Sequence, residues 1–99
     1  MIEETRVRRT DVGAVRVLTL SRPEKKNAFD VPQAAQVWRA IEDADADESV
    51  RVIVVTAEGD YFSGGADVNL FLQFANTDPA DIERVAHLYK PLRQCKKPT

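Results

Sequence analysis

The stretch Val50-Arg51-Val52-Ile53-Val54-Val55-Thr56 decides the fold. Its β-branched side chains favour extended backbone, and the run is too apolar to keep one face in water. A strand of this kind is covered on both faces and lies inside a sheet. The stretch therefore predicts a central, parallel strand.

A helix is predicted immediately before this strand. Asp30 can cap the first turn, and Gln33, three residues later, completes an Asp-x-x-Gln capping box. The next apolar residues recur at helical spacing, so that one face of the helix packs and the other is wet. This apolar stripe consists of Ala34, Val37, Trp38, Ile41 and Ala44.

Two β-rich runs lie between Val7 and Leu20, on either side of Asp11-Val12-Gly13. Gly13 can take the positive φ that a tight hairpin connection needs, so the runs predict an antiparallel pair. The second run alternates only in part, which indicates an internal strand. The order strand, helix, strand is a βαβ crossover, and the fold class is α/β.

The residues after the central strand predict turns and helices. Glu58-Gly59-Asp60 is a turn, and a helical turn is expected at about residues 67–72. Asp78 and Pro79 resemble an N-cap and a first helical residue, and Pro91 should kink or end the helix that follows. The apolar stripe of that helix comprises Ile82, Val85, Ala86, Tyr89 and Leu92. The last residues, 96–99, are typical of the beginning of another strand, so we interpret the chain as a fragment.

Composition excludes several function classes. The 99 residues are 43% hydrophobic and 30% charged, as in an ordinary globular chain that forms one domain or part of one. Fourteen basic and 16 acidic residues leave a formal charge of −2, which provides no broad field for nucleic acid or an anionic membrane. One cysteine, Cys95, excludes an internal disulfide, and one histidine, His87, argues against a zinc site. Without a signal-like or membrane-spanning run of roughly 20 apolar residues, a cytoplasmic protein is expected.

The glycine-rich segment Ser63-Gly64-Gly65-Ala66-Asp67 is the candidate site. In open α/β sheets, such a turn between a strand and a helix binds ligands, because backbone N–H groups converge there. Gly64 and Gly65 allow close approach, and the N–H of Ala66 can face a carbonyl oxygen that gains negative charge. One donor of this kind contributes about 2.7–4 kcal/mol in a transition state. A tight turn with only a structural role fits the two glycines equally well. The glycine spacing matches neither dinucleotide nor triphosphate signatures.

Four blocks of the sequence, in order, resemble the enoyl-CoA hydratase/isomerase or crotonase superfamily. They are Leu20-Ser21-Arg22-Pro23-Glu24-Lys25-Lys26-Asn27-Ala28, then residues 50–56, then Phe62-Ser63-Gly64-Gly65-Ala66-Asp67-Val68, and the closing Lys97-Pro98-Thr99. The resemblance implies that residues 1–99 are the N-terminal portion of a crotonase-like acyl-CoA domain, with its ββα spiral fold truncated. It also implies an enolate stabilised by an oxyanion hole, with the coenzyme A thioester as substrate and no separate cofactor or metal.

The resemblance assigns candidate roles residue by residue. Ala66 is expected to give the first oxyanion-hole N–H, and Asp67 is expected to cap the following turn. We expect Leu70 and Phe71, just after this turn, to line an acyl pocket. Arg22, Lys25 and Lys26 indicate a solvated loop on composition alone. The complete set expected to contact coenzyme A or the acyl group is Arg22, Lys25, Lys26, Ala28, Ser63, Gly64, Gly65, Ala66, Asp67, Val68, Leu70 and Phe71.

Other parts of the family's site are expected beyond Thr99, namely the second donor and the acid/base glutamates. Glu58 is interpreted as a solvated residue, His87 as a surface or half-buried residue and Cys95 as a small buried one. The hypothesis is therefore a hydratase or 3,2-isomerase whose present chain is inactive alone and whose full-length form is a trimer or hexamer. The alternatives are a non-catalytic CoA-binding or interaction module and an unrelated α/β nucleotide-binding domain.

Overall fold

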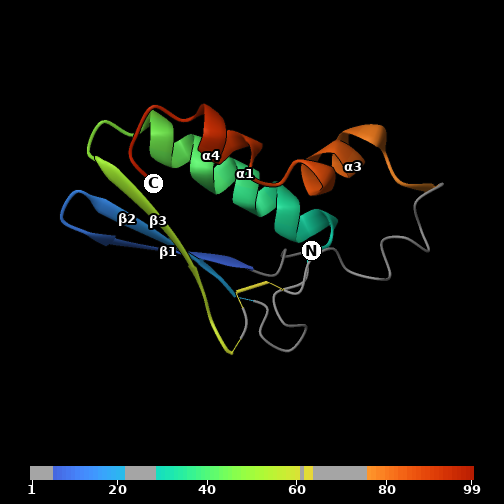
Figure 1. Ribbon diagram of the computed structural model, residues 1–99, viewed down its shortest axis with the longest axis horizontal. Helices are drawn as coiled ribbons and strands as arrows, with labels where there is room; N and C mark the ends of the chain where they lie inside the picture. Colours follow the sequence, from blue (N-terminus) through green and yellow to red (C-terminus); the bar gives the residue numbers. More distant parts are fainter. Residues whose placement is uncertain (1–5, 22–28, 61, 64–75) are drawn as a thin grey trace, which may run out of the picture.

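A computed structural model describes residues 6–21, 29–60, 62–63 and 76–99. In these residues a three-stranded sheet has helices on one face (Figure 1). The strands are β1 (Val7–Val12), β2 (Val15–Leu20) and β3 (Val52–Ala57), in the order β1-β2-β3. The helices are α1 (Val31–Ala46), α3 (Pro79–Ala86) and α4 (Lys90–Gln94). The α/β class is confirmed.

The hairpin and the crossover form as the sequence predicts. β1 and β2 are antiparallel, with Val12 opposite Val15, and Gly13 in the connection has a φ of 58°. β2 and β3 are parallel, with Val15 opposite Val52, and β2 is the middle strand. Because parallel neighbours need a long connection, α1 crosses from the hairpin to β3. It covers one face of the sheet (Figure 1).

The core lies between α1 and the sheet. Ala34, Val37, Ile41 and Ala44 of the predicted stripe are buried there. Trp38, the fifth member, is only half-buried, and its Nε1 donates to the Arg84 carbonyl at 3.1 Å, which joins α1 to α3. The buried residues that complete the core are Leu18, Leu20, Phe29, Val50, Ile53 and Leu88.

Asp30 caps α1 as expected, but the capping box is incomplete. The Gln33 N–H donates to the Asp30 carboxylate at 2.9 Å. The Gln33 side chain does not reach back, however. Its amide nitrogen and oxygen are fully buried and have no hydrogen-bond partner among the residues that the structure describes.

The structure differs from the predicted central strand in two respects. β3 begins at Val52 rather than Val50, and it is an edge strand among the described residues. Val54 is 40% exposed, because no described element covers the face of the sheet opposite α1. Ile53, on the other face, is fully buried, and its N–H donates to the Pro98 carbonyl at 3.0 Å. The last residues of the chain therefore lie beside β3.

The second helical region is two helices rather than one kinked helix. Asp78 caps α3 through the Ala80 N–H at 2.8 Å, as predicted, and α3 ends at Ala86. Pro91 lies in the first turn of α4, where its missing N–H needs no partner, so the break falls before it. This break changes the helical phase: Leu88 is buried, whereas Ala86 and Tyr89 of the predicted stripe are exposed.

Candidate acyl-thioester site

The candidate site follows the carboxyl end of β3. After Ala57 the chain turns through Glu58, Gly59 and Asp60, and the φ of 84° at Gly59 is a value that side chains rarely adopt. Phe62 is 48% exposed and Ser63 is half-buried. Ser63 immediately precedes Gly64 in the sequence, so the described chain reaches the first residue of the candidate glycine turn.

Most of the predicted site residues lie outside the described residues. Of the expected set, only Ser63 falls inside them. The others are Arg22, Lys25, Lys26, Ala28, Gly64, Gly65, Ala66, Asp67, Val68, Leu70 and Phe71. Their assigned roles stay predictions.

Ser63 lines a hollow of about 680 Å³. Phe29, which precedes α1, and Phe62 form part of its wall, and the α3–α4 region forms another part. The Tyr89 ring packs edge-on against Phe29, with the ring centroids 6.3 Å apart and the planes at 90°. The described residues that line the hollow are Phe29, Phe62, Ser63, Val85, Ala86, Leu88, Tyr89, Lys90 and Arg93.

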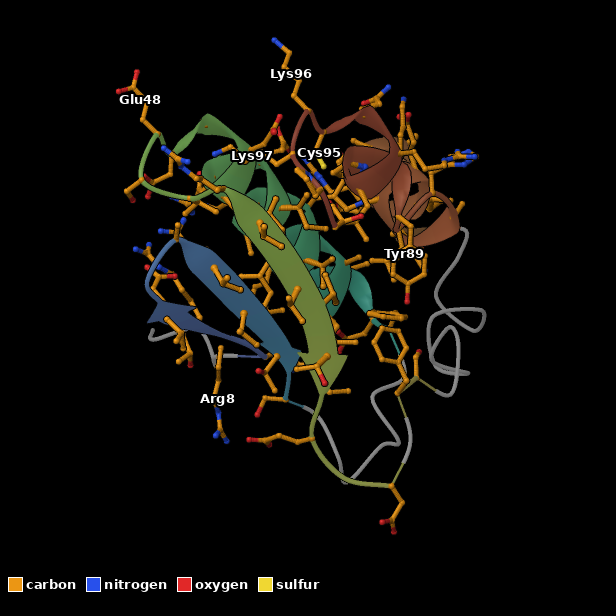
Figure 2. The ribbon with its side chains drawn as sticks, turned by 60° about the vertical axis from the view of Figure 1, so that its left-hand side comes forward. Arg8, Glu48, Tyr89, Cys95, Lys96 and Lys97 are labelled. Atoms are coloured by element: carbon orange, nitrogen blue, oxygen red, sulfur yellow. The ribbon has the colours of Figure 1, made fainter. Side chains whose placement is uncertain are left out.

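The hollow has a polar as well as an apolar lining. Figure 2 shows the Tyr89 side chain extending from the connection between α3 and α4, with its hydroxyl at the far end. Burial raises the pKa of this phenol above its ordinary value of 10.0, so the group stays protonated and can donate a hydrogen bond at neutral pH. Lys90 and Arg93, one turn apart on α4, add two cations.

Sequence reasoning missed these three residues. Tyr89 was assigned to an apolar stripe, and Lys90 and Arg93 had no assigned role. The available signal was Pro91, because a proline favours the first turn of a new helix as well as the interruption of an old one. A helix that begins at Lys90 brings positions 90 and 93 onto neighbouring parts of its surface.

Glu58 is a paired residue rather than the solvated one expected. Its carboxylate accepts from the Ser21 hydroxyl at 3.0 Å and lies 2.5 Å from the Arg8 guanidinium. The Glu58 N–H also donates to the Leu20 carbonyl at 2.9 Å. Ser21 immediately precedes the predicted CoA loop, so Glu58 fixes the end of β3 to the start of that loop.

The remaining single residues have structural surroundings. His87 is exposed and ends α3, as expected for a surface residue. Cys95 is half-buried rather than buried, and its thiol lies 3.3 Å from the carbonyls of Leu92 and Lys97. Among residues 6–21, 29–60, 62–63 and 76–99, no group of three or more His, Cys, Asp or Glu side chains could hold a metal ion. None of the helices in this part is long and apolar enough to cross a membrane.

Comparison with known proteins identifies relatives along nearly the whole chain. Residues 10–99 match the family described as Enoyl-CoA hydratase/isomerase. A carboxymethylproline synthase of Pectobacterium carotovorum subsp. carotovorum is 38% identical over 88 residues, which are 86% of this chain and 35% of that protein. An enoyl-CoA hydratase of Alternaria alternata is 30% identical over 95 residues, or 95% of this chain and 32% of that protein.

The structural comparison agrees. The crystal structure of an enoyl-CoA hydratase from Shewanella pealeana ATCC 700345 matches with a TM-score of 0.85 at 30% identity. The match covers 96% of this chain and 37% of that one. Fold and sequence together define a crotonase-type α/β chain.

The chain belongs to the enoyl-CoA hydratase/isomerase family. It spans about a third of the length of the curated relatives named above. The predicted family is thus confirmed, and the alternative of an unrelated nucleotide-binding domain is excluded.

Proposed function

We propose that this chain belongs to an enzyme that acts on acyl-CoA thioesters through an enolate. The N–H of Ala66 donates to the thioester oxygen as it gains negative charge, and Gly64 and Gly65 leave room for the substrate. Hydration of a 2-enoyl thioester and 3,2-isomerisation both place this negative charge on the thioester oxygen of an enolate. The observation that carries the proposal is a hollow lined in part by Ser63, the residue directly before Gly64, in a chain of this family.

The coenzyme is proposed to lie along two segments that Glu58 joins. The loop from Arg22 to Ala28 supplies cations for the phosphates, and the backbone of residues 65–68 follows the pantetheine. Glu58 bonds to Ser21 just before the first segment and itself precedes the second by a few residues. Because this contact fixes the two segments relative to each other, less conformational entropy is lost when the coenzyme binds.

Residues 1–99 alone are proposed to bind a coenzyme A thioester only weakly and not to turn it over. They contain one proposed backbone donor, and none of their glutamates is assigned as the acid or base. An enolate needs two donors and a proton carrier to form at a useful rate. Measured hydration of crotonyl-CoA by the 99-residue chain would contradict this. The second candidate is a CoA-binding module without catalysis. It requires the same binding of coenzyme A, and it differs in that the full-length protein would supply no acid or base.

Titration of the 99-residue chain separates thioester binding from nucleotide binding. Acetoacetyl-CoA, whose enolate resembles the proposed intermediate, should bind more tightly than ATP or NAD. Preference for either nucleotide would overturn the proposal.

The donor itself is tested by Ala66→Pro, which removes the N–H, against Ala66→Ser, which keeps it. In an active enzyme that carries this segment, the proline variant should lose about 10²–10³ in kcat. The serine variant should keep most activity. Equal loss in both variants would indicate that side-chain size, and not the N–H, matters at this position.

A further inference from the structure

The lining of the hollow is unbalanced in charge. Among the described residues that line it, Lys90 and Arg93 are cationic and none is acidic. Phe29, Phe62 and Leu88 supply an apolar wall. A site that accepted only a hydrocarbon chain would gain nothing from these two cations, whereas an anion would be attracted to them.

Neither cation is committed to a close ion pair. Lys90 Nζ lies 3.6 Å from Glu83 Oε1, a long contact between half-exposed groups. In the part of the chain that the structure describes, the Arg93 guanidinium has no ion pair. A guanidinium presents a planar fork of donors that fits the two oxygens of a carboxylate.

Tyr89, which stands between Leu88 and Lys90 in the sequence, adds a neutral hydrogen-bond donor to the lining. Its ring is fixed by the edge-on contact with Phe29. Within the described residues, no group forms a hydrogen bond with its hydroxyl. The hydroxyl is therefore free to donate to a ligand in the hollow.

We propose that this hollow accepts an acyl group whose far end carries a carboxylate, bound by Arg93, Lys90 and the Tyr89 hydroxyl. The inference rests on the proposed function and names its substrate class. Ser63 lines the hollow and precedes the proposed oxyanion donor by three residues in the sequence, so we assign the hollow to the group attached to the reacting carbonyl. A short chain of methylene groups packs against the apolar wall, and the terminal carboxylate pairs with the two cations.

The phosphates of coenzyme A are the other anions that could reach these cations. The apolar wall argues against them, because phosphates at the hollow would have to lie against Phe29 and Leu88 rather than in water. The proposed coenzyme path also runs along the loop from Arg22 to Ala28, on a different segment. The experiment therefore has to separate the acyl carboxylate from the phosphates.

The test compares glutaryl-CoA with pentanoyl-CoA, whose acyl chains have equal length and end in a carboxylate or a methyl group. Calorimetry on the 99-residue chain should show that glutaryl-CoA binds about fivefold more tightly, as for one exposed charge pair. Arg93→Gln should remove this preference and leave pentanoyl-CoA binding unchanged. Tyr89→Phe, which keeps the ring, should reduce the preference in part. Arg51→Gln, at an exposed position before β3, is the matched control and should change neither affinity.

The corresponding pantetheine thioesters, which lack the nucleotide phosphates, complete the design. Glutaryl-pantetheine should keep its advantage over pentanoyl-pantetheine. Equal binding of both acyl groups would overturn the inference while leaving the proposed function intact. So would an Arg93→Gln variant that weakens both CoA esters equally and neither pantetheine ester, because the cation would then serve the phosphates. Failure of every thioester to bind would remove the proposed function as well.

Discussion

Gln33 and Gln36 are less than one turn apart on α1 and have opposite surroundings. The Gln36 side-chain oxygen accepts from the backbone N–H groups of Arg6, at 2.7 Å, and Val7, at 3.3 Å. It therefore fixes β1 to the helix. The Gln33 amide is fully buried without a partner among the described residues, which costs about 1–3 kcal/mol relative to an apolar group of similar shape.

Replacement of Gln33 by methionine should therefore stabilise the protein. Methionine has a similar volume and no amide to desolvate, so we expect the free energy of unfolding to rise by about 1 kcal/mol. Urea denaturation followed by circular dichroism measures it. Gln36→Met is the matched control and should destabilise by a similar amount, because it leaves two backbone donors unpaired. A loss of stability in Gln33→Met would mean that the amide has a partner in solution.

Arg16 is a buried cation that the sequence analysis did not single out. It is 1% exposed and lies opposite Asp11 in the β1–β2 register. Its Nε donates to Asp11 at 2.9 Å and its Nη2 to Asp47 at 2.8 Å. The period of two in β2 places Arg16 on the same face as Leu18, but only the register and the position of Asp47 show how its charge is satisfied.

Stability should fall in acid because of Asp47. The Ser49 hydroxyl, the Ser49 N–H and Arg16 hold the pKa of its carboxyl well below the ordinary value of 3.8. A group whose folded pKa is lowered stabilises the fold above its unfolded pKa, and the contribution is lost as pH falls from there toward the folded value. The urea midpoint should therefore drop between about pH 5 and pH 2. Asp47→Asn should show a smaller drop, whereas Glu48→Gln, at an exposed neighbouring position, should behave as the unmodified protein does.

The hairpin between β1 and β2 depends on one backbone conformation. Gly13 has a φ of 58°, and a Cβ placed on it would meet no atom within 4 Å. A substitution there is therefore opposed by backbone strain and not by packing. This makes position 13 a clean test of the turn.

Gly13→Ala should destabilise the protein by about 1–2 kcal/mol, the usual cost of the left-handed region for a side chain. Gly13→Asn should recover part of this, since asparagine tolerates that region. Thermal unfolding of the two variants beside the unmodified chain measures the difference. If alanine and asparagine cost the same, the turn changes conformation to relieve the strain.

At the level of elements, the sequence predicted those whose signals are local. The cap at Asp30, the glycine of the hairpin and the β-branched run of β3 each act within a few residues. The end of α3 was misplaced because Pro91 is compatible with both a kink and a new first turn. Whether Pro91 kinks the helix or begins a new one depends on whether Leu88 can reach the core, and that is a tertiary contact.

For the whole molecule, the family and fold could be predicted because four separate blocks occur in the expected order. The exposure of one face of β3 could not be predicted, since the composition of a strand does not say which element covers each face of the sheet. The site was predicted around Ala66, yet the residues that shape the hollow, Tyr89 and Arg93, lie far from it in sequence. They come together only through the packing of α3 and α4 against α1.

The uncovered face of the sheet has a consequence for the isolated chain. Three parallel cross-strand pairs lie on it: Val15 with Val52, Val17 with Val54, and Thr19 with Thr56. Val54, at 40%, and Thr56 are exposed, and the other four residues are half-buried. A contiguous apolar surface of this kind promotes association, and we propose that the full-length protein is a homo-oligomer.

The 99-residue chain should therefore self-associate in a concentration-dependent way. Sedimentation velocity over a range of concentrations measures it. Val54→Lys places a charge at the centre of this face, and its desolvation should weaken association about tenfold. Gln94→Lys adds the same charge on exposed α4 and should leave association unchanged. If both variants weaken association equally, net charge rather than this face controls association. If the chain stays monomeric at every concentration, the apolar pairs on β2 and β3 are too small a surface to hold two copies together.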